Sequence, residues 1–234
     1  MVEVLNSLDK QTQLKKQAGE SAAEYVKDGM VVGLGTGSTV EWTIRKIGEY
    51  VRTGMEIIGI PTSVRSEELA KEFGIPLSTL LEHPEIDLTI DGADEVDPKL
   101  NLIKGMGGAL TREKIVASSS KQEIIVVDDS KLVDVLGTKS PLPVEVLKFA
   151  WSGCLTNLEK FNAKPILRIK DQKEYVTDNN NYILDCRFES IPNPEELEIK
   201  INNIPGVLEN GLFLKLTDKV IVASESKIKV LTTG

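Results

Sequence analysis

The stretch MVVGLGTGST, residues 30–39, decides the fold class. Its first half, 30–34, is a short apolar run typical of a buried strand, and its second half is rich in glycine and hydroxyl side chains. The residues that follow, as far as Val51, have the spacing of an amphipathic helix. A strand, a glycine-rich loop and a helix in this order predict one βα unit of a parallel sheet.

The same alternation continues on both sides of this stretch. Strands are expected over 55–60, 86–90 and 123–127, and helices over 11–27, 63–73 and 111–118. We therefore predict an α/β fold with a Rossmann-like, mostly parallel sheet and helices on both faces. Ligands of such sheets bind at loops that leave the carboxyl ends of the strands. The polar loops of this kind are 33–39, 91–108 and 128–131.

The pattern changes near Ser140-Pro141-Leu142-Pro143. The elements expected beyond it are a strand, a helix, two strands, a helix and a strand, over 144–149, 152–161, 165–170, 182–188, 194–203 and 206–214. This βαββαβ order predicts a small ferredoxin-like α+β domain. A last strand, 218–224, is expected to return to the first sheet. We therefore predict a Rossmann-like catalytic domain formed by 1–140 and 212–234, and a small α+β domain formed by 141–211.

The composition is that of a globular protein and excludes nucleic acid as a partner. Of the 234 residues, 41% are hydrophobic and 27% are charged, so a folded core is expected. The 36 acidic residues exceed the 28 basic ones and give a net charge of −8. No Lys/Arg cluster forms the basic stripe that a nucleic acid backbone requires. An anionic ligand must therefore be held by a few local charges and backbone N–H groups.

The cysteines and the apolar runs predict a cytoplasmic protein. Cys154 and Cys186 form no CxxC motif, so two reduced thiols in a reducing compartment are expected. Residues 1–10 contain three charged side chains and no long apolar run, which argues against a secretory signal. No apolar run approaches the length of a membrane span, so we expect no membrane contact.

The loop 33–39 is a candidate anion site. Its glycines allow close approach of the backbone, while hydroxyls and a helix N-terminus donate to the anion. A dinucleotide fingerprint would need glycine at Ser38, and a P-loop would need a Gly-Lys-Ser/Thr sequence that does not follow. A single phosphate fits better. A tight strand-to-helix turn, with glycine there for geometry alone, is the alternative.

The segment Asp91-Gly92-Ala93-Asp94-Glu95 follows an apolar strand. Carboxylates at the end of a buried strand need hydrogen-bonding partners, and the hydroxyls of a polyol suit them. One alternative is a plain loop in which Asp91 caps the turn. A Mg²⁺ site is another, but no EF-hand spacing supports it.

The stretch 104–114, KGMGGALTREK, carries the most chemical information. A lysine, a glycine-rich loop and a glutamate in the first turn of a helix place a cation, backbone amides and a carboxylate around one point. Proton transfer beside a carbonyl needs this set, namely a base and donors for the developing oxygen charge. Alternatively, Glu113 only complements the positive end of the helix. The sole histidine, His83, lies in a polar loop beside a proline and is read as a surface residue.

These motifs together resemble the ribose-5-phosphate isomerases of type A. The resemblance rests on their order along the chain and extends over nearly all of it, including Ile60-Pro61-Thr62-Ser63, Val176-Thr177-Asp178-Asn179 and Ile204-Pro205-Gly206-Val207. The core motifs are Thr36-Gly37-Ser38-Thr39, Asp91-Gly92-Ala93-Asp94, Lys104-Gly105-Met106-Gly107, Leu110-Thr111-Arg112-Glu113-Lys114 and Asp129-Ser130-Lys131.

The resemblance implies an aldose–ketose isomerase that interconverts ribose 5-phosphate and ribulose 5-phosphate in the pentose phosphate pathway, without cofactor or metal. It implies that Glu113 moves a proton between C1 and C2 through an enediolate, and that Lys104 and the amides of 105–108 stabilise its oxygens. Asp91 and Asp94 would bind the sugar and open its ring. The expected substrate-binding residues are Thr36, Gly37, Ser38, Thr39, Asp91, Gly92, Ala93, Asp94, Lys104, Gly105, Met106, Gly107 and Lys131.

The resemblance also implies a small-molecule sugar phosphate as ligand and a homodimer or homotetramer. Met106 departs from the family pattern, because many members have glycine there. We expect methionine to be tolerated if its φ is negative. The alternatives are a non-catalytic sugar-phosphate sensor, another enzyme of related fold such as an amino-sugar phosphate deaminase or a CoA transferase, and an enzyme that uses Mg²⁺ at the Asp-rich loop.

Overall fold

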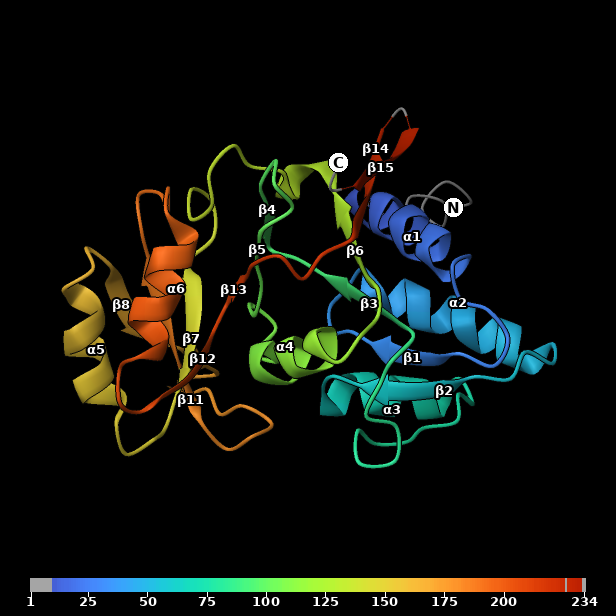
Figure 1. Ribbon diagram of the computed structural model, residues 1–234, viewed down its shortest axis with the longest axis horizontal. Coiled ribbons are helices and arrows are strands. Elements are labelled where there is room, and N and C mark those ends of the chain that lie inside the picture. Colours follow the sequence, from blue (N-terminus) through green and yellow to red (C-terminus); the bar gives the residue numbers. More distant parts are fainter. Residues whose placement is uncertain (1–9, 226, 233–234) are drawn as a thin grey trace, which may run out of the picture. The chain divides into compact units, whose positions relative to one another are not determined.

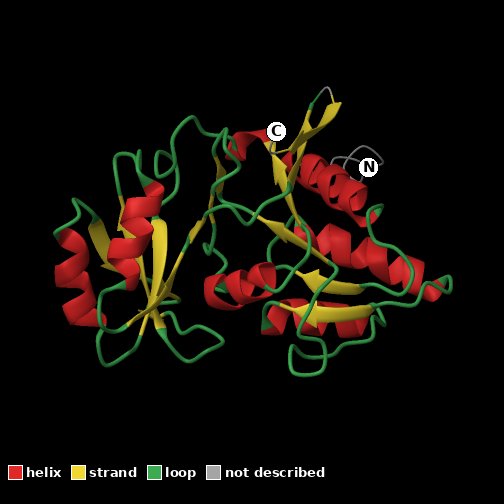
Figure 2. Ribbon diagram, viewed as in Figure 1, coloured by secondary structure: helices red, strands yellow, loops and turns green. Residues whose placement is uncertain are grey.

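The computed structural model describes residues 10–225 and 227–232, and the chain forms two compact units. The first consists of 1–92, 119–130 and 218–234, and the second of 93–118 and 131–217. Figure 1 labels their helices and strands, and Figure 2 distinguishes helices from strands by colour. No helix in the described ranges combines the length and the apolar character that crossing a membrane requires.

The first unit contains a six-stranded sheet in the order β15-β14-β6-β3-β1-β2. Every neighbouring pair is parallel except β14 and β15, which are antiparallel. The strands are β1 (Val31–Leu34), β2 (Ile58–Pro61), β3 (Leu88–Gly92), β6 (Glu123–Asp128), β14 (Lys219–Ser224) and β15 (Lys227–Thr232). The predicted α/β class with a mostly parallel sheet is therefore confirmed.

Three helices of the first unit contribute to one apolar core. They are α1 (Lys10–Ala23), α2 (Val40–Arg52) and α3 (Val64–Glu72). Their small and branched side chains pack with alternate strand residues such as Leu34 and Ile90. The strand residues between these, such as Ile125 and Val222, are also buried, so both faces of the sheet are covered. Burial on both faces explains why these strands are continuous apolar runs.

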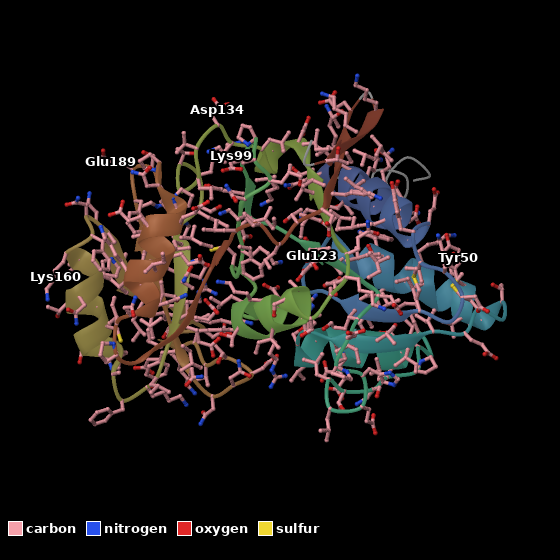
Figure 3. The ribbon with its side chains drawn as sticks, in the orientation of Figure 1. Tyr50, Lys99, Glu123, Asp134, Lys160 and Glu189 are labelled. Carbon is pink, nitrogen blue, oxygen red and sulfur yellow. The ribbon has the colours of Figure 1, made fainter. Side chains whose placement is uncertain are left out.

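The last part of the chain returns to the first sheet as predicted. β14 pairs in parallel with β6, and Asp218 fixes the register by accepting a hydrogen bond from the Glu123 N–H at 2.7 Å and donating its own N–H to the Glu123 carbonyl at 3.0 Å. Glu123, the first residue of β6, is labelled in Figure 3. On its other side, β6 pairs in parallel with β3, so the carboxyl ends of these two strands lie side by side, where the predicted ligand loops begin.

The second unit contains the predicted ferredoxin-like arrangement. The elements β7 (Leu142–Val146), α5 (Trp151–Glu159), β8 (Lys164–Leu167), β11 (Tyr182–Arg187), α6 (Pro194–Asn202) and β12 (Val207–Asn210) follow one another as βαββαβ, with the hairpin β9 (Ile169–Lys170) and β10 (Lys173–Glu174) between β8 and β11. The four main strands are antiparallel in the order β12-β7-β11-β8. Both helices contribute to the core of this unit, with side chains such as Leu158 and Ile201.

Two further pieces of the second unit carry candidate site residues. A small sheet joins β4 (Glu95–Val96), β5 (Leu102–Ile103) and β13 (Leu212–Phe213), and α4 (Leu110–Ser118) packs on β12 and β7. The expected strand 206–214 is thus two strands in different sheets. Gly211 divides them, because its carbonyl accepts from the Lys104 N–H at 2.9 Å and its N–H donates to Pro143 at 2.8 Å. A side chain at Gly211 would overlap the Lys104 carbonyl.

The two compact units do not have the boundaries predicted for the domains. Residues 141–211 lie in the second unit and 1–92 in the first, as the prediction requires. The segments 93–118, 131–140 and 212–217 pack with the second unit, whereas the prediction assigned them to the Rossmann-like domain. The division into 1–140 with 212–234 and 141–211 stays a prediction about folding domains.

Candidate active site

In the first unit, the loop after β1 is held by glycine geometry and by Asp91. Gly35 lies so close to the Asp91 carboxylate that a Cβ would overlap it. The Thr36 N–H donates to Oδ1 of Asp91 at 3.0 Å. Gly37 has a φ of 129°, which favours glycine. Ser38 and Thr39 complete the turn into α2, a 13-residue helix whose N-terminal amides and dipole favour an anion.

The hydroxyl of Thr36 contacts two hydroxyls that follow the next strand. It lies 2.8 Å from the Thr62 hydroxyl and donates to the Ser63 hydroxyl at 2.7 Å. Thr62 in turn donates to the Leu34 carbonyl at 3.0 Å, and Ser63 caps α3. Thr62 and Ser63 belong to the Ile60-Pro61-Thr62-Ser63 motif but are not among the predicted site residues. They fix the side chain of Thr36. The sequence signal that could have identified them is the Ile-Pro-Thr-Ser segment at the end of a predicted strand.

Asp91 is the buried end of β3. It is 1% exposed, and its Oδ1 accepts hydrogen bonds from Thr36 N–H and, at 2.7 Å, from Gly92 N–H. These hydrogen bonds offset part of the free-energy cost of burying a carboxylate. In the first unit, then, the structure brings Thr36, Gly37, Asp91 and Gly92 together at the carboxyl ends of β1 and β3.

In the second unit, Asp94 contacts the glycine-rich loop. Its Oδ2 accepts the Met106 N–H at 3.0 Å, and its own N–H donates to the Ile103 carbonyl at 2.8 Å. Burial raises the pKa of the Asp94 carboxyl above its ordinary value, and the Met106 hydrogen bond and the charges of Lys104, Lys131 and Arg168 only partly oppose this rise. The half-buried Lys131 therefore lies within electrostatic reach of Asp94, as a shared site requires.

The raised pKa of Asp94 has a consequence for stability. Ionised Asp94 is disfavoured in the folded chain relative to the unfolded one, so its ionisation lowers the free energy of unfolding as the pH rises through the raised pKa. We expect Asp94→Asn to have a higher melting temperature than the parent at about pH 7, and this advantage to shrink towards about pH 4 as the parent carboxyl becomes protonated. Thermal unfolding over this range measures the difference; an advantage that grows on acidification would contradict the assignment.

Lys104 and Glu113 form a buried ion pair. Lys104 Nζ lies 3.5 Å from Glu113 Oε2, and the two side chains are 2% and 3% exposed. Lys104 follows β5 and also lies over the Phe213 ring at 5.3 Å, while Glu113 occupies the first turn of α4. Removing two charges from water costs several kcal/mol per ion, so such a pair is a weak stabilising device. A desolvated carboxylate beside a cation is suited to proton transfer.

The loop between these two residues adopts the conformation that tolerates Met106. Gly105 and Gly108 have φ values of 102° and 85°, whereas Met106 is not among the residues with positive φ. The condition for tolerating methionine, a φ that is not positive, is therefore met. The Met106 N–H donates to Asp94 and the Gly108 N–H to the Gly105 carbonyl at 3.0 Å. Of the amides expected to face a developing oxygen charge, these two are already engaged within the protein.

Arg168 binds backbone carbonyl groups of this loop. It donates to the carbonyls of Gly105 at 3.0 Å and Met106 at 3.1 Å, and its Nε donates to Asp185 Oδ2 at 2.8 Å. Tyr175 adds a longer bond to the Gly107 carbonyl at 3.4 Å. Sequence reasoning missed both residues. The only available signal was an arginine inside an apolar strand pattern, 165–170, which the structure divides at Arg168.

The structure therefore brings the predicted residues together in two groups, one in each unit. The group in the first unit is the one described above around Asp91. The group in the second unit consists of Asp94, Lys104, Gly105, Met106, Gly107, Glu113 and Lys131. Within residues 10–225 and 227–232, no group of three or more His, Cys, Asp or Glu side chains has an arrangement suited to a metal ion.

Comparisons with known proteins agree with one another. The family model of ribose 5-phosphate isomerase A (phosphoriboisomerase A) matches residues 58–227. The chain is 52% identical over 220 residues to ribose-5-phosphate isomerase A of Gloeobacter violaceus, which covers 94% of this chain and 96% of the relative.

Solved structures give the same result. Ribose 5-phosphate isomerase A from Methanocaldococcus jannaschii is 44% identical with a TM-score of 0.91, over 95% of this chain and all of that one. A D-ribose-5-phosphate isomerase in complex with phospho-erythronic acid is 44% identical with a TM-score of 0.93, over 96% of this chain and 100% of that one.

Proposed function

Since the chain belongs to the ribose 5-phosphate isomerase A family and interconverts D-ribose 5-phosphate and D-ribulose 5-phosphate, we propose that Glu113 is its catalytic base and Lys104 its main electrophilic donor. The observation that carries this proposal is the buried ion pair of these two side chains, 3.5 Å apart. It unites a proton acceptor and a fixed positive charge, the two groups that enolisation of a sugar carbonyl needs.

The proposed reaction moves one carbon-bound proton. In the aldose-to-ketose direction, the Glu113 carboxylate removes the proton from C2, and the electron pair moves to the carbonyl oxygen on C1, which gives an enediolate. Protonated Glu113 then delivers the proton to C1, the hydroxyl proton passes from the C2 oxygen to the C1 oxygen, and a carbonyl forms at C2. The Lys104 ammonium stabilises the negative charge on the oxygens. The amides of Gly105 and Gly107 are the remaining candidate donors of the loop.

The carboxyl groups of Asp91 and Asp94 are proposed to bind the sugar hydroxyls and to open the furanose ring. Ring opening needs an acid that protonates the ring oxygen and a base that accepts the anomeric hydroxyl proton. The raised pKa of Asp94 suits it to the acid role, because it keeps its proton to a higher pH than an ordinary aspartate. Asp91, whose Oδ1 accepts two backbone N–H groups, is proposed as the base of this step.

The phosphate is proposed to bind the loop Thr36–Thr39, with Lys131 as a further substrate contact. Three features of the loop support this: the glycine at 37, the fixed hydroxyl of Thr36 and the N-terminus of α2. Gly92 and Ala93 link the two aspartates, and their role is to present backbone atoms to the same substrate.

We also propose a cytoplasmic homodimer or homotetramer. Both cysteines are free and buried, which suits a reducing compartment. Phe149 and Ile166 of the second unit are 99% and 66% exposed, and a subunit interface would cover such side chains. Light scattering from purified protein measures the mass in solution; a monomer at all concentrations would contradict the oligomer.

The test of the function is conversion of ribose 5-phosphate to ribulose 5-phosphate by purified protein in EDTA. The appearance of the ketose measures the rate. The account predicts turnover that EDTA does not reduce. A folded protein that binds the sugar phosphate without converting it would be a sensor instead, and turnover that EDTA abolishes and Mg²⁺ restores would identify a metal enzyme.

A further inference from the structure

Glu145, on β7, has an unusually complete set of hydrogen bonds for a buried carboxylate. Its exposed fraction is 0%. Oε1 accepts from the Thr177 hydroxyl at 2.8 Å, the Asn181 side-chain amide at 3.0 Å and the Asn179 side-chain amide at 3.3 Å. Oε2 accepts from the Thr111 hydroxyl at 2.5 Å. Every one of these partners donates, so hydrogen bonds hold both oxygens of the Glu145 side chain in place.

These contacts lead from the small sheet to the helix that carries Glu113. Thr111 lies in the first turn of α4, two residues before Glu113. The residue between them, Arg112, donates from Nε to the Asn179 side chain at 2.8 Å and from Nη2 to the Asp178 carbonyl at 3.0 Å. The segment Val176-Thr177-Asp178-Asn179, which the sequence singled out without a role, is therefore one of the two supports of this turn.

The loop that supplies the donors is closed by hydrogen bonds of its own. The Thr177 hydroxyl accepts the N–H groups of Asn179 at 3.3 Å and Asn181 at 3.1 Å while it donates to Glu145. The Thr177 N–H donates to the Asn181 carbonyl at 3.0 Å. A closed turn of this kind gives Glu145 a fixed set of partners, so the position of Thr111 is determined by β7 and not by α4 alone.

We propose that Glu145 is a positioning residue for the proton transfer. It fixes the first turn of α4 through Thr111, and thereby the direction of the Glu113 carboxylate towards the carbon-bound proton. This inference rests on the proposed role of Glu113 as base. Because misplacement of a reacting group by about 1 Å can cost about 10²-fold in rate, loss of the anchor is expected to lower kcat more than it changes KM.

The test uses Thr111→Val, which removes the donor to Glu145 at nearly constant volume, and Thr111→Ser, which restores a hydroxyl. The control is Thr156→Val on α5, where an exposed hydroxyl donates only to the Ser152 carbonyl. We expect Thr111→Val to lower kcat about tenfold with KM changed less than about twofold, Thr111→Ser to recover most of that loss, and Thr156→Val to keep the parental kcat.

Glu145→Gln, alone and combined with Thr111→Val, then tests whether Thr111 acts through Glu145. The account predicts that the second substitution adds little to the loss in kcat caused by the first. Thr111→Val with an unchanged kcat and only a lower melting temperature would overturn the proposal, as would fully multiplicative losses in the double variant.

Two measurements separate failure of this inference from failure of the function. An inactive parent protein would refute the proposed function, and an active Glu113→Gln variant would refute the role of Glu113 as base. Activity in the parent that is lost in Glu113→Gln but kept in Thr111→Val would refute only the positioning role of Glu145.

Discussion

Glu113→Gln is expected to lower kcat about 10³- to 10⁴-fold, since general base catalysis contributes an effect of this order. Glutamine keeps the shape of the side chain and can still accept from Lys104, which lies 3.5 Å away, but it cannot take a proton from carbon. Binding should change little, because the substrate contacts elsewhere are untouched. Initial rates in both directions, together with calorimetric titration of the sugar phosphate, measure the two effects.

The matched control is Glu209→Gln. Glu209 also accepts from a lysine, Lys114, at 2.7 Å in the same unit, but it lies outside the proposed site. Its substitution is expected to leave kcat within about threefold, the size of a typical surface effect. Glu113→Gln with a kcat close to that of the parent would show that another group removes the proton.

Lys104→Met is expected to lower kcat by about 10²- to 10³-fold, the usual cost of removing one fixed donor from an oxyanion. The loss has a second cause. Without the ammonium group, the buried carboxylate of Glu113 has lost its nearby cation, so its ionised form is disfavoured and the acid limb of the pH–rate profile moves to higher pH. Steady-state rates across the pH range separate the two contributions, because only the second is relieved at high pH.

Lys114→Met provides the comparison. Both lysines lie over the Phe213 ring, at 5.3 Å for Lys104 and 5.0 Å for Lys114, and both pair with glutamates. Only Lys104 pairs with the proposed base. A pH–rate profile of Lys104→Met that matches that of Lys114→Met would contradict a special role for Lys104.

The parallel sheet and the ferredoxin-like order were predictable because they depend on local patterns. Apolar runs such as 123–127 keep their strand character in any context, and Gly37 marks a turn that few other residues adopt. The residues Asp91, Lys104 and Glu113 were accessible for the same reason: each stands at the end of a strand or the start of a helix.

The supporting residues were not predictable, because their partners are distant in sequence. Arg168 contacts carbonyls 62 and 63 residues away, and Glu145 meets Thr111 across 34 residues. Nothing local distinguishes a glutamate in a strand that will be fully buried from one that will face water. β15 was also not predicted; its side chains are mostly exposed, so no buried apolar run marks it.

The most direct test of the central claim is deuterium incorporation when the enzyme holds ribose 5-phosphate and ribulose 5-phosphate at equilibrium in D₂O, followed by NMR over many turnovers. The account predicts that deuterium accumulates at C2 of the aldose and C1 of the ketose with the parent protein, and far more slowly with Glu113→Gln. Many turnovers without any deuterium in either sugar would indicate direct hydride transfer and contradict the enediolate. Incorporation by Glu113→Gln at the parental rate would contradict Glu113 as the base.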